Sequence, residues 1–241
     1  MCVVTKISGM ISDSSLSMSD VVDQFSRGII TNSRIIIPEL SEQENTQLNT
    51  ALHRLKVFGV SGQENGLHLL VDAEYTYMNK GISAFALAMM VALNRDKPVV
   101  WNTYQCYLKQ ALNTISSEMK VVRDTGACFG AKIVRGAYME KEKKLAKKHG
   151  YEDPVNDSYE ATGEMYNKVV NLMMDNIAQE ITDNKINMVV ATHNESGALH
   201  AARKMLDSGI PPDSGHVVFG QIYGEDTILV RISINYYFRY G

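Results

Sequence analysis

Several short apolar runs of this sequence end in polar side chains that can donate or accept hydrogen bonds. The clearest case is AKIVRGAYMEKEKKLAKKHG at residues 131–150, where a β-type run carries Lys132 and Arg135, meets Gly136 and opens into a charged helix. Parallel strands of an α/β barrel bring such ends to one edge, where ligand sites form. The polar strand ends are Asp72-Ala73-Glu74, Asn102-Thr103-Tyr104-Gln105, Arg135-Gly136-Ala137-Tyr138, Thr192-His193-Asn194-Glu195 and Gln221.

The residue types at these strand ends favour a polar organic ligand. Taken singly, each has an ordinary structural role, since Asp72 could cap a helix and Gly136 could form a plain turn. Together they leave many hydrogen-bonding groups at one edge that need a partner, and a flat polar heterocycle would supply it. The spacing of His and carboxylate residues suggests no metal site, and no Ser or Cys stands beside a base as a nucleophile would.

The elements that would position these residues alternate between β-type runs and helical periodicity, which is typical of βα units around a parallel sheet. The six β-type runs cover residues 3–8, 67–71, 99–102, 131–134, 188–192 and 217–219. Lys6 lies within the first run, on the face opposite to Thr5 and Ile7. No internal repeat or low-complexity segment interrupts the pattern, so we expect one domain over residues 1–241.

Helical periodicity predicts helices over residues 19–29 with Ser19 as N-cap, and over 42–57, 83–96, 103–126, 139–150 and 161–181. The segment 83–96 is apolar on all sides and should be buried. Gly126 is a candidate C-cap. We expect the stripe of Met165, Met173 and Met174 to pack in the core, and the lysine run at 141–148 to face solvent.

Composition argues against several functional classes. The 241 residues are 45% hydrophobic and carry a net charge of −3 with acids and bases interleaved, so we expect no basic face for nucleic acid. Three cysteines without CxxC spacing favour a reducing compartment. The N-terminus MCVVTKISGMIS lacks the pattern of a secretory or transit signal. No apolar run approaches the ~20 residues that span a bilayer, so any membrane contact would be peripheral.

The polar strand ends belong to longer segments, which read LLVDAEYTY, NTYQCYL, FGAKIVRGAYMEKEKKLA, GYEDPVNDSYEAT, VVATHNE and FGQIYG. In this order and spacing they resemble the motifs of the proline dehydrogenase family, in its eukaryotic branch, and VTKISGM resembles that family's first barrel strand. The resemblance implies an α/β fold, a distorted TIM-like (βα)8 barrel, with FAD as a non-covalent cofactor. It also implies oxidation of proline to pyrroline-5-carboxylate, with electrons passed to a quinone at the matrix side of the mitochondrial inner membrane.

The same resemblance implies which residues hold FAD. Gly136 has no side chain, so the backbone could approach a flat ring closely, and Lys132 would favour the reduced flavin, which carries extra electron density. Neutral donors and backbone N–H groups after the run 188–192 suit a phosphate. The implied FAD-binding residues are Ala73, Gln105, Lys132, Val134, Gly136, Ala137, Tyr138, Thr192, His193, Asn194 and Gln221.

On the substrate side the resemblance implies Lys6, Asp72 and Tyr138. Hydride leaves the carbon beside the proline nitrogen most readily when the amine is neutral, and Lys6 and Asp72 would set the charge balance for that step. Tyr138 would form a wall and a hydrogen-bonding group. Hydroxyproline is an alternative substrate that these residues do not separate from proline.

The sequence departs from the family after Gly224, where residues 225–241 match none of its motifs. Too few residues follow Phe219 for two more βα units, because one βαβ unit takes about 30 residues. We therefore expect about six βα units in an open barrel without the family's last helix, whose arginine pair clamps the substrate carboxylate. We expect this chain alone not to turn over proline at a normal rate. A catalytically inactive fragment that binds flavin or a partner stays open as an alternative.

Overall fold

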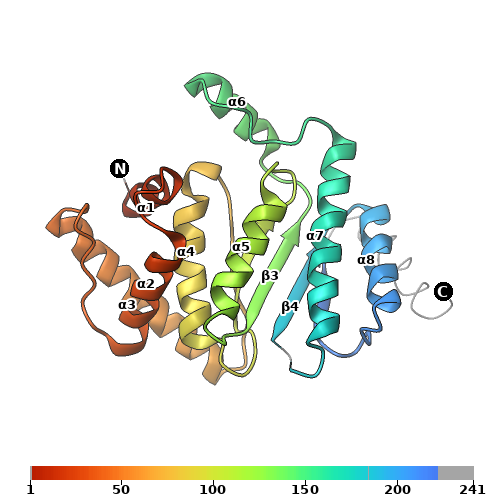
Figure 1. The fold of residues 1–241 in the computed structure, drawn as a ribbon, viewed down its shortest axis with the longest axis horizontal. Coiled ribbons are helices and arrows are strands. Elements are labelled where there is room, and N and C mark those ends of the chain that lie inside the picture. Colours follow the sequence, from red (N-terminus) through yellow and green to blue (C-terminus); the bar gives the residue numbers. More distant parts are fainter. Residues whose placement is uncertain (1, 184, 222–241) are drawn as a thin grey trace. The chain divides into compact units, whose positions relative to one another are not determined.

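The computed structural model describes residues 2–183 and 185–221, so the divergent segment 225–241 lies outside the described residues. Helices and strands alternate along most of it (Figure 1). The helices are α1 (Val3–Ser12), α2 (Met18–Thr31), α3 (Glu42–Glu64), α4 (Thr76–Leu93), α5 (Ala111–Arg123), α6 (Met139–His149), α7 (Tyr159–Gln179) and α8 (Glu195–Asp207). The strands are β1 (Leu69–Val71), β2 (Val100–Gln105), β3 (Phe129–Val134), β4 (Ile186–Ala191) and β5 (Val217–Gly220).

The strands follow one another in the sheet in the order β1-β2-β3-β4-β5. β1 runs parallel to β2, with Leu69 opposite Val100, and β4 runs parallel to β5, with Met188 opposite Val217. The predicted α/β class is therefore confirmed. The described residues contain five of the six predicted strands, each overlapping its predicted run, because the first run has a different structure.

Residues 3–8, which we predict to be the first strand, form part of helix α1 instead. The strand prediction is wrong because Val3, Ile7 and Ile11 are buried along one face at helical spacing. This face packs against α4, where a side chain at Gly81 would overlap the Val4 carbonyl oxygen. Tertiary packing thus overrides the β preference of the valines and isoleucine.

Two further predicted boundaries need correction. α2 has Ser17 and not Ser19 as its N-cap, since the Ser17 hydroxyl accepts from the Asp20 N–H at 3.1 Å. The helix predicted over 103–126 begins only at Ala111, because the buried residues that follow Asn102 continue strand β2 to Gln105. α3 begins at Glu42 as predicted and continues to Glu64.

The chain divides into two compact units, which are described separately. The first contains Met1–Asn102 and Glu118–Gly130, and the second contains Thr103–Ser117 and the chain from Ala131 onward. β2 and β3 contribute residues to both units. That residues 1–241 form one domain stays a prediction.

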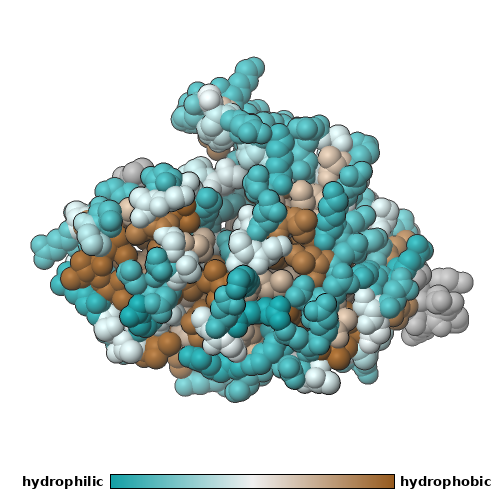
Figure 2. Space-filling model, in the orientation of Figure 1, coloured by the Kyte–Doolittle hydropathy of each residue, from teal (hydrophilic) through white to brown (hydrophobic). Residues whose placement is uncertain are grey.

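The core positions agree with the sequence. In the first unit, α4 buries a continuous stretch from Ser83 to Val91, as its apolar composition predicts. In the second unit, Met173 and Met174 are fully buried in α7 and Met165 is half-buried. The lysines of α6 are exposed, and Figure 2 shows the surface of this helix as hydrophilic. No helix within the described residues is both long and apolar enough to cross a bilayer.

Candidate functional site

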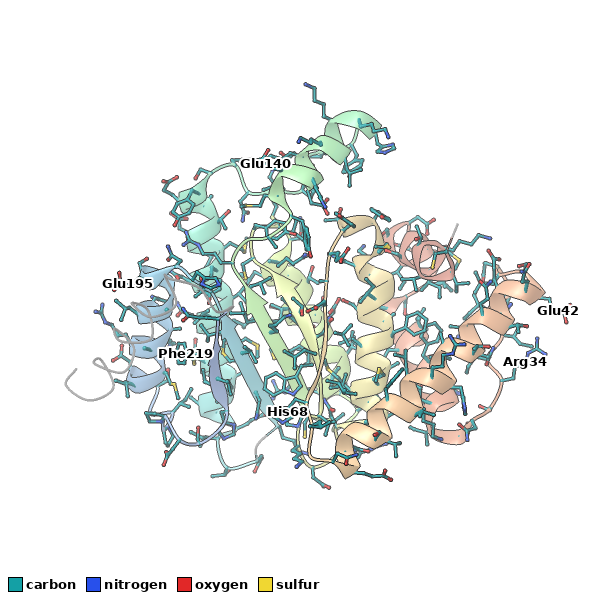
Figure 3. The ribbon with its side chains drawn as sticks, turned by 180° about the vertical axis from the view of Figure 1, so that it is seen from behind. Arg34, Glu42, His68, Glu140, Glu195 and Phe219 are labelled. Carbon is teal, nitrogen blue, oxygen red and sulfur yellow. The ribbon has the colours of Figure 1, made fainter. Side chains whose placement is uncertain are left out.

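The second unit contains ten of the predicted site residues, at or after the carboxyl ends of β2 to β5. The Cys106 N–H donates to the Val134 carbonyl at 2.8 Å, which holds the end of β2 beside the end of β3. Glu140 and Glu195 lie at the start of the helices that follow β3 and β4, and Phe219 lies near the end of β5 (Figure 3). The ten residues are Gln105, Lys132, Val134, Gly136, Ala137, Tyr138, Thr192, His193, Asn194 and Gln221.

The β3 end presents an open backbone next to polar side chains. Gly136 and Ala137 are exposed, and among the described residues a Cβ built on Gly136 would meet, within 4 Å, only the flexible Met139 side chain, 3.3 Å away at its closest. Tyr138 is half-buried at the start of α6, with the Lys141 ammonium 5.8 Å from its ring centroid. A planar molecule could therefore approach the main chain at Gly136 without displacing backbone atoms.

The neighbouring strands add buried and half-buried polar groups. Gln105 is buried at the end of β2, and Lys132 is half-buried within β3. After β4, Thr192 is buried and His193 is exposed. The Gln221 side-chain amide donates to the Thr192 carbonyl at 3.0 Å, which ties the segment after β5 to the end of β4.

Asn194 fixes the loop between β4 and α8. Its side-chain oxygen accepts from the Gly197 N–H at 2.8 Å and so caps α8. Its backbone N–H donates to the Thr192 hydroxyl at 3.1 Å. Its side-chain NH₂ donates to the Tyr159 hydroxyl at 2.8 Å. The Asn194 side chain thus holds the loop to α8 through Gly197 and to α7 through Tyr159.

Arg135 and Tyr159 form a contact that the sequence pattern does not predict. The Arg135 guanidinium lies 4.3 Å over the Tyr159 ring, and its Nη1 donates to the Tyr159 hydroxyl at 3.2 Å. Gly163, one turn further along α7, leaves room for the guanidinium, since a Cβ there would lie 3.0 Å from it. The Nε of Arg135 is buried and has no hydrogen-bond partner among the described residues.

Two buried side chains of the same unit, Cys106 and Tyr166, have raised pKa values. Burial raises the pKa of the Cys106 thiol far above its usual range, so the nucleophilic thiolate does not form there. Burial also raises the pKa of the Tyr166 phenol, and Arg135 opposes part of that rise. The Tyr166 hydroxyl has no hydrogen-bond partner within the described residues.

The remaining predicted site residues belong to the first unit. Asp72 is exposed and Ala73 is half-buried, directly after β1. Lys6 does not lie in a strand as predicted, because it is part of α1, where its ammonium pairs with the Glu44 carboxylate at 2.5 Å. Hydrogen bonds from Lys6 and from the backbone and hydroxyl of Ser41 lower the pKa of Glu44 to about 2. These contacts give Lys6 a structural partner in α3.

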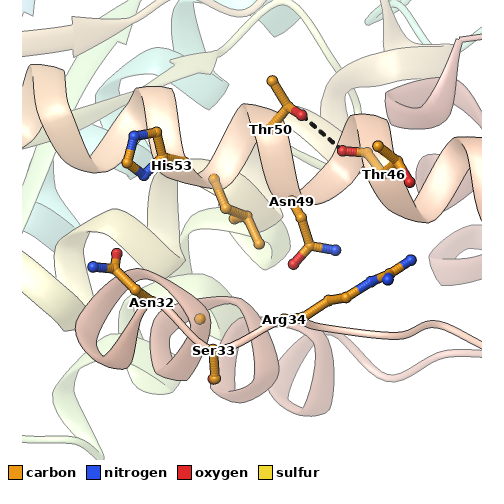
Figure 4. Close-up of a pocket in the computed structure, with 9 residues that line it drawn as sticks. Asn32, Ser33, Arg34, Thr46, Asn49, Thr50 and His53 are labelled. Carbon is orange, nitrogen blue, oxygen red and sulfur yellow. Dashed lines mark hydrogen bonds between the residues drawn. The ribbon is translucent and has the colours of Figure 1, made fainter.

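A groove of the first unit contains none of the predicted site residues. It lies between the end of α2 and α3, and Figure 4 shows Asn32, Asn49 and His53 facing it. Two of its polar side chains bond the main chain of the same unit: Asn49 bonds both polar groups of Ile35, and Thr50 donates to the Thr46 carbonyl. These bonds give Asn49 and Thr50 a structural role at the groove.

Comparison with known proteins identifies the family. The sequence model described as proline dehydrogenase matches residues 7–227. The chain belongs to the proline dehydrogenase family. The hydroxyproline dehydrogenase of Xenopus laevis is 45% identical over 185 residues, which are 77% of this chain and 39% of that protein. The human mitochondrial proline dehydrogenase 1 is 40% identical over 190 residues, which are 78% of this chain and 31% of that protein. The chain thus spans less than two fifths of the length of these relatives.

Solved structures support the fold of this proline dehydrogenase family chain. Proline utilization A from Bdellovibrio bacteriovorus matches with a TM-score of 0.67 and 16% identity, over 90% of this chain and 25% of that one. The protein of the same name from Corynebacterium freiburgense matches with a TM-score of 0.57 and 18% identity, over 90% of this chain and 24% of that one. At this identity the likeness concerns the fold, and a TIM-like barrel is consistent with it.

Proposed function

We propose that this chain is the FAD-binding part of an enzyme that oxidises proline or hydroxyproline and passes the electrons to a quinone. One observation supports this most strongly: the ends of β2 to β5 bring polar groups around an open backbone at Gly136, in a chain whose residues 7–227 match the proline dehydrogenase family. The names of relatives also support a mitochondrial location, and we propose the matrix side of the inner membrane.

The residues after β3 and β4 fit a flavin. Gly136 leaves its backbone open to a planar ring, and Lys132 is a half-buried cation within β3, the strand that precedes Gly136. Arg135, whose buried Nε has no hydrogen-bond partner among the described residues, adds a second positive charge near the loop that contains Asn194. This donor set suits a ligand with a flat polar ring and anionic phosphates. When bound, FAD would supply the acceptor for a hydride.

The chain's own groups would hold and orient the reactants. Gln105 and Gln221 would bond the edge of the ring, while Thr192, His193 and Asn194 would bind its ribityl and phosphate part. Lys132 would stabilise negative charge that develops on the ring. Ala73 and Tyr138 would contact FAD, and Asp72 and Tyr138 would face the substrate. Lys6 no longer enters the proposal as a strand residue, because it pairs with Glu44 on α3.

Proline and hydroxyproline both remain candidate substrates of the proposed enzyme. The Xenopus laevis hydroxyproline dehydrogenase is 45% identical, the human proline dehydrogenase 1 is 40% identical and the human hydroxyproline dehydrogenase is 37% identical. These identities make hydroxyproline a second candidate and do not rank the two substrates. Discrimination between the two depends on whether a buried polar group of the protein faces the hydroxyl of hydroxyproline. Such a group would stay unpaired when proline binds, which would lower the affinity for proline.

Anaerobic flavin reduction tests the proposal. The chain is loaded with FAD, mixed with proline or with hydroxyproline, and followed by the loss of flavin absorbance. We expect FAD to be retained and to be reduced slowly by one of the two amino acids, because this chain alone is expected to lack the arginine pair that binds the substrate carboxylate. Retained FAD that neither amino acid reduces would leave only the flavin-binding part of the proposal. A chain that does not retain FAD would contradict it.

A further inference from the structure

Tyr159 joins the end of β3 to the end of β4 through its hydroxyl group. The oxygen accepts from Arg135 Nη1 at 3.2 Å and from Asn194 Nδ2 at 2.8 Å. Tyr159 is the first residue of α7 and is 65% exposed. Sequence position does not suggest this role, because Asn194 is 35 residues away.

Both partners of the Tyr159 hydroxyl can only donate. A guanidinium N–H has no acceptor capacity, and the Asn194 amide must present its NH₂ to Tyr159, because its oxygen already accepts from the Gly197 N–H. A phenol oxygen has two lone pairs and one proton. With both lone pairs used, the O–H proton must point to an acceptor elsewhere, and none of the described residues accepts it.

The charged group in contact with the Tyr159 side chain is a cation, Arg135. The guanidinium of Arg135 stacks on the Tyr159 ring, and no carboxylate within the described residues pairs with it. Its buried Nε also has no partner there. An outward-pointing O–H donor beside an uncompensated cation favours an anionic oxygen, and such charge-assisted hydrogen bonds are about twice as strong as neutral ones.

We propose that Tyr159 and Arg135 bind a phosphate group, with the Tyr159 hydroxyl donating to a phosphate oxygen. This rests on the proposed function in one respect only, that the phosphate is part of the bound flavin dinucleotide. Tyr159 is then a binding residue that also fixes two loops, since the same oxygen that donates to the ligand accepts from both strand ends.

The first test uses inorganic pyrophosphate as the probe, with binding followed by calorimetry. Tyr159→Phe keeps the ring under Arg135 and removes only the hydroxyl. Losing one charge-assisted hydrogen bond should weaken pyrophosphate binding about tenfold. The matched control is Tyr151→Phe, which removes the hydroxyl of another exposed tyrosine of the second unit and should leave binding unchanged. Equal affinity in Tyr159→Phe, or no pyrophosphate binding by the unaltered chain, would overturn the proposal.

The second test compares FAD with riboflavin, which lacks phosphate. We expect Tyr159→Phe to weaken FAD binding about tenfold and to leave riboflavin binding unchanged. An equal loss for both ligands would mean that the hydroxyl only holds the loops, and would refute the phosphate contact. A chain that binds pyrophosphate through Tyr159 but binds no flavin would contradict the proposed function and leave this site in place.

Discussion

Replacing Asn94 by alanine should destabilise the first unit more than a typical single substitution. Asn94 is fully buried at the C-terminal end of α4. Its side-chain oxygen accepts from the N–H groups of Val99 and Val100 at 2.9 and 2.8 Å. Its NH₂ donates to the carbonyls of Val100 and Cys128 at 2.8 and 3.0 Å. One side chain therefore joins the start of β2 to the segment that leads into β3.

The magnitude follows from these four hydrogen bonds. Each contributes about 1 kcal/mol net, so their loss should lower the free energy of unfolding by about 4 kcal/mol, and by more where a buried group stays unpaired. Globular domains are stable by only about 5–15 kcal/mol, so the variant should be close to unfolding. Asn94→Asp keeps the two accepted bonds but loses the two donated ones and buries a carboxylate, so it should not restore stability.

Urea unfolding followed by far-UV circular dichroism measures the effect. With a slope of about 2 kcal/mol per molar urea, the midpoint of Asn94→Ala should fall by about 2 M. Asn65→Ala is the matched control, because Asn65 is exposed at the end of α3 and should change the midpoint little. Equal midpoints for the two alanine variants would refute the reasoning, since they would show that the Asn94 bonds are replaced at no cost.

Three further outcomes are expected. In thermal unfolding, Gly81→Ala should lower stability by about 1–3 kcal/mol, because the added Cβ would overlap the Val4 carbonyl oxygen. Gly9→Ala should raise stability by about 0.5–1 kcal/mol, because a Cβ there would meet no neighbouring atom of the described residues within 4 Å; a reversed order would contradict the packing of α1 on α4. The pKa of Glu44 is lowered from 4.5 to about 2, so its ionised form stabilises the fold above about pH 4.5 and this contribution is lost as the pH falls toward 2; Glu44→Gln should flatten that loss in a pH series of melting temperatures, and an unchanged slope would argue against the Lys6 pair. Gly136→Leu should reduce FAD retention without lowering the melting temperature, and equal retention would remove Gly136 from the site.

Local sequence patterns predict the strands of the sheet well, because each β-type run is bounded by polar or turn residues. The runs at 131–134 and 217–219 lie inside β3 and β5, and the other three overlap β1, β2 and β4. The first run fails for a physical reason. The β-branched residues of this run favour a strand, but Val3, Ile7 and Ile11 also have the spacing of one helical face. Helix or strand is decided by packing against Gly81, which is more than 70 residues from Val4 in the sequence.

The candidate site shows the same division between local and distant information. Polar residues after strands 2 to 5 could be predicted because the carboxyl edge of a parallel sheet collects them. Tyr159 could not, since its role depends on Arg135 and Asn194, which approach it only after β3, α7 and β4 have packed. The predicted roles of the individual site residues stay predictions that ligand binding must test.

Hydrogen exchange with and without FAD tests the central claim most directly, because it locates the bound cofactor on the chain. The account predicts that FAD slows amide exchange in residues 132–138 and 192–197, at the ends of β3 and β4, and leaves residues 28–53 around the groove of the first unit unchanged. FAD that binds without slowing exchange at these two strand ends, or that protects the groove instead, would contradict it.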